Sequence, residues 1–142
     1  MTGPVSAITL LALAALFGGM LAFTGMFAPL VFIKLPPATA GNFIRAIFPW
    51  YYLYVLLLSA LGAVGIAATH GLVHEVVLMG LVAVGAIYAR WGLIPAINRL
   101  RDRELAGDPA AASRFKQRHR LSVIINGTQL VVVGYVLLAY VA

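Results

Sequence analysis

Four long runs of apolar residues, separated by short polar stretches, make up most of the chain. They extend over about residues 4–33, 41–69, 72–105 and 109–141, and a helix needs about 20 apolar residues to cross a membrane. The third run continues past the membrane as a polar extension, and the fourth crosses from about residue 119. This pattern predicts an all-α membrane protein: one antiparallel four-helix transmembrane bundle that forms a single domain over residues 1–142.

Prolines and glycines separate or interrupt these runs. Pro37 follows the first run, and Gly107 precedes an Asp108-Pro109 helix start. Pro49 and Pro95 lie inside the second and third runs, where each predicts a bend. Small residues spaced four apart in the first run predict close packing between helices; they are Ala15, Gly18, Gly19 and Ala22. An interfacial aromatic belt is predicted just beyond Arg45, from Trp50, Tyr51, Tyr52 and Tyr54.

The charges change the picture by giving it an orientation. The chain is 63% hydrophobic and only 10% charged, with a formal net charge of +6. All ten basic residues flank the connections after the first and third runs. They are Lys34, Arg45, Arg90, Arg99, Arg101, Arg103, Arg114, Lys116, Arg118 and Arg120. The positive-inside rule therefore predicts cytoplasmic basic connections, exterior or periplasmic termini, and a bacterial inner membrane. It also makes the lipid bilayer, and not nucleic acid, the expected partner.

Polar residues form a stripe in the first half of the fourth run. His119, Ser122, Asn126 and Gln129 are spaced three, four and three apart, so they fall within about 80° of one helical face. One interpretation is an internal seam of hydrogen bonds between helices. The other is a polar cleft that opens to the cytoplasm and ends near the middle of the membrane.

Arg45, Arg90 and Asn98 are predicted at the same level as His119. They are candidates for the mouth of such a cleft, where they would attract an anionic group; the alternative is that the arginines snorkel and anchor helix ends. Four further basic residues are candidates for binding lipid headgroups, although they also serve as simple topology markers. These four are Arg114, Lys116, Arg118 and Arg120.

Metal or catalytic chemistry has few candidate residues here. The sequence has no cysteine and four acidic residues, so thiolate sites are excluded and paired-carboxylate chemistry has little to work with. His70 and His74 are weak metal candidates in a short exterior turn. No cofactor and no catalytic residue is predicted.

Three stretches of the chain, GGMLAFTGMFAPLVF, AGNFIRAIFPWYY and FKQRHRLSVIINGTQ, resemble the DUF4149 family, the TMEM205-like membrane proteins. The more specific elements are Phe48-Pro49-x-Tyr51-Tyr52 and His119-x-x-Ser122-x-x-x-Asn126. The resemblance implies a small four-helix membrane protein and assigns no activity.

Three functions fit these observations. The first is binding or moving a small polar ligand or ion through the cytoplasmic cleft. The second is a structural or accessory subunit of a larger membrane complex, and a homo-oligomer is also compatible with the small size. The third is a haem- or metal-dependent redox protein. The sequence favours a protein that is not an enzyme.

Overall fold

Helices account for nearly all of the described chain in the computed structural model, which describes residues 3–69 and 73–142. Within these residues, four helices are long and apolar enough to cross a membrane. The first comprises α1 (Pro4–Ala22), the π-helical turn η1 (Phe23–Phe27) and α2 (Ala28–Lys34). The second is α3 (Pro37–Thr69), the third comprises α4 (Val73–Tyr88), the π-helical turn η2 (Ala89–Leu93) and α5 (Ile94–Leu105), and the fourth is α6 (Pro109–Val141). The predicted fold class, a four-helix transmembrane bundle, is confirmed.

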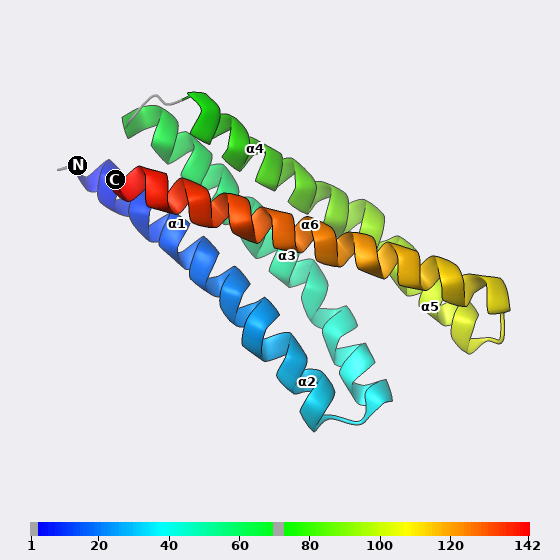
Figure 1. Ribbon diagram of the computed structural model, residues 1–142. Helices are drawn as coiled ribbons and strands as arrows, with labels where there is room; N and C mark the ends of the chain where they lie inside the picture. The colour runs from blue at the N-terminus through cyan, green and yellow to red at the C-terminus, as the bar shows by residue number, and fades with distance from the viewer. Residues whose placement is uncertain (1–2, 70–72) are drawn as a thin grey trace.

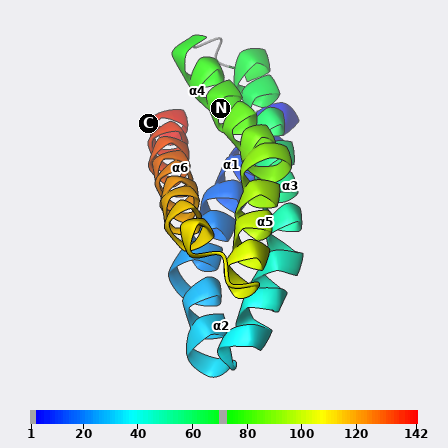
Figure 2. The ribbon, with the colours of Figure 1, turned by 90° about the vertical axis from the view of Figure 1, so that its right-hand side faces the viewer.

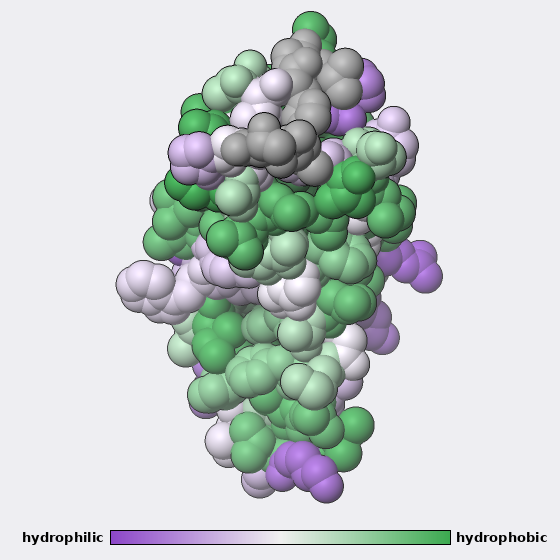
Figure 3. All heavy atoms as spheres, turned by 90° about the vertical axis from the view of Figure 1, so that its left-hand side faces the viewer, coloured by the Kyte–Doolittle hydropathy of each residue, from purple (hydrophilic) through white to green (hydrophobic). Residues whose placement is uncertain are grey.

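The four helices form two hairpins that converge at one end of the molecule and diverge at the other. The α2–α3 connection joins the first hairpin, α1–α2 with α3, and the α5–α6 connection joins the second, α4–α5 with α6; where the hairpins converge, α4 also packs closely against α3 (Figure 1). Both chain ends lie where the hairpins converge, whereas the α2–α3 and α5–α6 connections lie well apart in both ribbon views (Figures 1 and 2). The basic residues gather in the diverging half, which we call the basic end. Seen from the side of the chain ends, the surface is mainly hydrophobic (Figure 3).

Each π-helical turn is followed by a proline in the second position of the next helix. Pro29 follows η1 and Pro95 follows η2. A proline inside a helix has no N–H to donate, and its ring clashes with the carbonyl four residues earlier. A wider turn relieves this clash, because its hydrogen bonds join residues five apart, as in Ala28 N–H to Phe23 O and Ile94 N–H to Ala89 O. The predicted bend at Pro95 thus corresponds to a π-helical turn, and the equivalent feature at Pro29 was not predicted.

The apolar core divides below these turns. The main core contains buried residues from α1, α3, α4, η2, α5 and α6, such as Leu16 and Val133. A second, smaller cluster joins Val31 of α2 to Ala40 and Ile44 of α3. None of the residues of η1 is buried. Below η1 the first hairpin therefore packs mainly on itself, and this separates it from α5 and the start of α6.

Some local predictions differ from the structure. The second helix begins at Pro37, before its predicted start at about residue 41, because proline is well suited to the first turn of a helix. Pro49 lies within one continuous helix. The predicted aromatic belt is wrong for Tyr51 and Tyr52, which are buried in the main core, whereas Trp50 is exposed. Tyr51 stacks on Phe23 of η1 with ring centroids 4.2 Å apart.

The start of α6 is fixed by its first residues. The Asp108 carboxylate accepts a hydrogen bond from Ala110 N–H at 3.0 Å, as an N-cap does. It also accepts one from Arg103 Nη2 at 2.7 Å, and this arginine holds the pKa of the Asp108 carboxyl below its usual value. The connection between α5 and α6 is therefore short and braced, with Gly107 at a φ of 93°.

Close contact between α1 and α3 depends on a glycine. A Cβ atom at Gly65 would lie 2.9 Å from the Thr9 Cβ, and Thr9 is itself buried. Gly18 in α1 has nothing within 4 Å of such a Cβ. Among the small residues of the first run that were predicted to pack closely, Gly19 does so, because a Cβ atom there would lie 2.7 Å from the Tyr54 Cζ of α3. Gly18 does not, and the contact at Gly65 was not predicted.

We expect Gly65→Ala to lower the free energy of unfolding by about 1–3 kcal/mol, because the added methyl group overlaps a side chain that has no room to move. Thermal unfolding in detergent measures the change. Gly18→Ala is the matched control and should be neutral or slightly stabilising, since alanine is a better helix former than glycine. Equal effects of the two substitutions would contradict the packing described here.

Candidate functional site

A cleft of about 720 Å³ lies between the two hairpins at the basic end. One wall comes from the end of α2 and the start of α3, and the other from α5 and the first turns of α6. Its lining residues come from the parts of the two hairpins whose ribbons diverge in Figures 1 and 2. Its volume is within the range of about 300–1,000 Å³ that ligand pockets usually have.

Most of the sixteen lining residues are apolar or small. They are Phe32, Pro37, Ala38, Gly41, Ile44, Phe48, Ile94, Ile97, Leu105 and Phe115. The other six are Asn42, Arg45, Asn98, Arg101, His119 and Ser122. The cleft is therefore less polar than the sequence pattern predicted, and three of its polar groups are basic side chains. None of its described lining residues is acidic.

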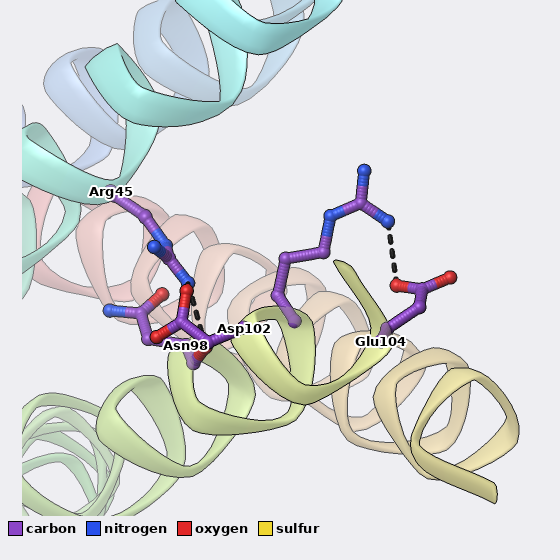
Figure 4. Close-up of polar contacts among 5 residues, drawn as sticks. Arg45, Asn98, Asp102 and Glu104 are labelled. Atoms are coloured by element: carbon purple, nitrogen blue, oxygen red, sulfur yellow. Dashed lines mark hydrogen bonds and ion pairs between the residues drawn. The ribbon is translucent and has the colours of Figure 1, made fainter. Parts of the chain in front are cut away.

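Arg45 connects the two walls of the cleft. From α3 its Nη2 donates to the backbone carbonyl of Asn98 at 2.6 Å and to Asp102 Oδ1 at 2.8 Å, both on α5 (Figure 4). Guanidinium groups suit such paired contacts because their donors form a planar fork. Arg45 is thus neither lipid-facing nor simply an anchor of its own helix: it links the hairpins where their apolar cores have separated.

Arg101 is held from outside the cleft in a similar way. Its Nη1 donates to Glu104 Oε2 at 2.6 Å (Figure 4), and its guanidinium lies over the Phe115 ring at 5.4 Å. His119 stacks on the same Phe115 ring, with the two ring centroids 5.9 Å apart. The Arg101 guanidinium, the Phe115 ring and the His119 imidazole therefore line one wall of the cleft together.

The predicted polar stripe of α6 divides into two parts. His119 and Ser122 line the cleft, and Ser122 Oγ donates to the His119 carbonyl at 2.8 Å. Asn126 and Gln129 do not line it. Asn126 Oδ1 accepts from Tyr51 Oη at 2.5 Å, and its Nδ2 donates to Thr24 Oγ1 at 2.8 Å.

Gln129 lies deeper and is 5% exposed. Its Nε2 donates to the Val82 carbonyl at 2.9 Å, while its buried Oε1 has no hydrogen-bond partner among the described residues. Asn126 and Gln129 therefore form the seam of interhelical hydrogen bonds that was one of the two interpretations. The deep half of the stripe joins α6 to η1, α3 and α4.

The remaining predicted residues differ in their position relative to the cleft. Arg90, in η2, donates to the Pro49 carbonyl and lies 4.9 Å over the Trp91 ring, away from the cleft lining. Asn98 lines the cleft as predicted. The four candidates for headgroup binding, Arg114, Lys116, Arg118 and Arg120, are all exposed on α6.

The weak metal candidates do not assemble a site in the described part of the chain. His70 lies outside the described residues. His74 is exposed, and its Nε2 is 3.9 Å from Glu75 Oε1. No group of three or more His, Cys, Asp or Glu side chains that could hold a metal ion occurs within residues 3–69 and 73–142.

Several lining residues escaped the sequence analysis. Phe32, Phe48 and Phe115 are hydrophobic residues in hydrophobic or amphipathic segments, so nothing local separates them from the core. Arg101 looks like one more surface arginine of the basic segment. Pro29 was the available signal, because a proline deep inside a membrane run indicates that the helix is interrupted there.

A comparison of the sequence with models of protein families identifies the family of this chain. A model described as Domain of unknown function (DUF4149) matches residues 11–105 of the chain. The chain belongs to the DUF4149 family. In this DUF4149 protein the match covers most of α1 and continues to the end of α5, whereas α6 lies beyond it. The His119-x-x-Ser122-x-x-x-Asn126 element therefore lies outside the matched residues, and the likeness to TMEM205 stays a prediction.

No curated protein and no solved structure matches this DUF4149 chain. The matched residues nevertheless include most of the cleft. Both walls as far as Leu105, with Arg45, Asn98 and Arg101, belong to the family segment, and α6 adds Phe115, His119 and Ser122.

Proposed function

We propose that this DUF4149 protein is a membrane-embedded binding protein that takes up an organic anion in the cleft between its hairpins. The observation that carries the proposal is the lining: Arg45, Arg101 and His119 face a cavity that no acidic side chain of the described residues lines. Cations in a concave site with low-dielectric walls attract anions more strongly than the same charges on an open surface.

The positions of the carboxylates support this proposal. Asp102 and Glu104 pair with Arg45 and Arg101 from outside the lining. They hold the two guanidinium groups, and neither carboxylate is among the residues that line the cleft. Because each guanidinium has five N–H donors, one ion pair leaves further donors for a bound anion.

A one-sided binding site fits this arrangement better than a continuous pore. Above the cleft, the helices close through the bonds of Tyr51, Asn126 and Thr24, and then through buried apolar residues such as Val133 and Val136. Access from the basic end is therefore the expected route. The accessory-subunit and redox alternatives stay predictions, and no contact among the described residues favours either over binding.

We propose further that the basic end faces the cytoplasm of a bacterial inner membrane. The support is the grouping of all ten Lys and Arg residues around the two connections at this end. The cleft then opens towards the cytoplasm, and both chain ends lie on the opposite side.

The chain offers a direct test of orientation because it contains no cysteine. Ser113→Cys places a thiol at the basic end and Gly3→Cys places one at the other end. A membrane-impermeant maleimide should label Ser113→Cys only in inside-out vesicles and Gly3→Cys only in intact cells. The reverse pattern would contradict the proposed orientation.

Anion preference in the cleft can be tested without knowing the ligand. A side chain at Gly41, which lines the cleft, meets nothing within 4 Å of its Cβ, so Gly41→Cys should fold normally. We expect a sulfonate-bearing methanethiosulfonate to react with it at least about tenfold faster than a trimethylammonium-bearing one, because the field is focused there. The rates of both reactions measure this ratio.

The matched control for that experiment is Ser113→Cys, which lies beside Arg114 on an exposed turn of α6. It should show a smaller preference, because open surface charges are screened by solvent and salt. Adding Arg45→Met and Arg101→Met to Gly41→Cys should remove most of the preference. An unreactive thiol at Gly41, or equal rates for both reagents, would count against a binding cleft.

A further inference from the structure

We propose that the anion is a membrane lipid, bound with its phosphate between Arg45 and Arg101 and with an acyl chain along the apolar wall of the cleft. This inference rests on the proposed function, which requires only an organic anion. It adds the chemical class of the ligand and the route by which it arrives.

The apolar wall indicates that the ligand has a hydrocarbon part. Phe32 of α2 and Phe48 of α3 face the cleft from one side, Leu105 of α5 and Phe115 of α6 face it from the other, and none of these four side chains is buried. A small hydrophilic anion at the arginines would leave these surfaces in contact with water. A hydrocarbon chain would cover them, and burial of apolar area is the main favourable term in such binding.

The rim of the cleft carries exposed apolar side chains. Phe32 of α2 and Leu105 of α5 line the cleft on opposite hairpins, yet they are 57% and 70% exposed. Next to Phe32, Ile33 is 72% exposed. An acyl chain that enters between the hairpins would therefore meet exposed apolar side chains at this rim, which a small hydrophilic ligand would not need.

The two arginines of the lining have hydrogen-bond donors to offer to a phosphate. Arg45 and Arg101 come from different hairpins. The bonds of Arg45 to α5 both use Nη2, and the bond of Arg101 to Glu104 uses Nη1. Among the described residues, the other guanidinium nitrogens of these arginines have no hydrogen-bonding partner, and arginine binds phosphate oxygens through such paired donors.

The position of the site along the chain agrees with this ligand. The cleft lies at the basic end, where exposed Arg114, Lys116, Arg118 and Arg120 would concentrate anionic lipids near the membrane surface. These four residues attract lipid without lining the cleft. The structure thus separates a general surface attraction from a specific site, and the two can be tested independently.

The experiment uses the full-length protein in a mild non-ionic detergent with lipids added as mixed micelles. Three probes are compared by the shift in melting temperature over a range of concentrations: phosphatidylglycerol, phosphatidylcholine with the same acyl chains, and soluble glycerol phosphate. We expect a saturable rise in melting temperature with phosphatidylglycerol, and at least about tenfold weaker apparent affinity for the other two probes.

Variants locate the binding. Combining Arg45→Met with Arg101→Met should weaken phosphatidylglycerol binding at least about tenfold. The matched control combines Arg114→Met with Arg118→Met, which removes the same charge from exposed positions outside the lining, and should change the affinity less than about threefold. Arg45→Lys keeps the charge and the fold but loses the fork of donors, so it should weaken binding by an intermediate amount.

The outcomes separate this inference from the proposed function. If glycerol phosphate binds as well as phosphatidylglycerol, and both depend on Arg45 and Arg101, the ligand is a soluble anion and the lipid inference is wrong, while the proposed function stands. Equal stabilisation by phosphatidylcholine would also overturn it. If no probe binds in a way that depends on these two arginines, the lipid inference is wrong, and the proposed function fails with it only if Gly41→Cys also shows no preference for the anionic reagent.

Discussion

Two prolines inside membrane-spanning helices impose the constraint on which the rest of this structure depends. In a bilayer, backbone groups that lose their helical partner find no water to replace it. Pro29 and Pro95 each remove one donor from such a helix, and each is preceded by a π-helical turn, η1 or η2. These turns keep the chain helical past the proline. Below them the apolar core separates into a part that joins all four helices and a small cluster that belongs to the first hairpin alone.

This separation gives the two halves of the molecule different roles. The half near the chain ends is closed, with tight contact at Gly65 and with hydrogen bonds from Asn126 and Gln129 between helices. The basic half is open, and Arg45 crosses the opening to Asn98 and Asp102. A residue that joins two hairpins through an exposed ion pair contributes little stability, typically about 0–1 kcal/mol. The position of Arg45 at the cleft is consistent with a role in binding, because the stability of the fold depends little on this ion pair.

The sequence predicted the architecture because the apolar runs that specify it extend over whole helices. Four apolar runs and ten basic residues on one side specify helices, their number and their pairing. The polar stripe of α6 was correctly singled out, but periodicity alone did not show that it changes role between Ser122 and Asn126. That change depends on how far α2 and α3 lie from α6 at each level, which is a property of the packed structure. The apolar wall was not predicted, because Phe32, Phe48 and Phe115 have the same local pattern as core residues.

The most direct test of the account is to locate a bound lipid. Phosphatidylglycerol with a photoreactive group in its acyl chain can be crosslinked to the protein in bilayers and the adducts mapped by mass spectrometry. The account predicts adducts concentrated in residues 37–48 of α3 and 94–105 of α5, and their loss when Arg45 and Arg101 are both replaced by methionine. Adducts spread evenly over lipid-facing residues such as Leu57, Leu81 and Leu138, all exposed on the outer surface, with no change in that variant, would contradict it.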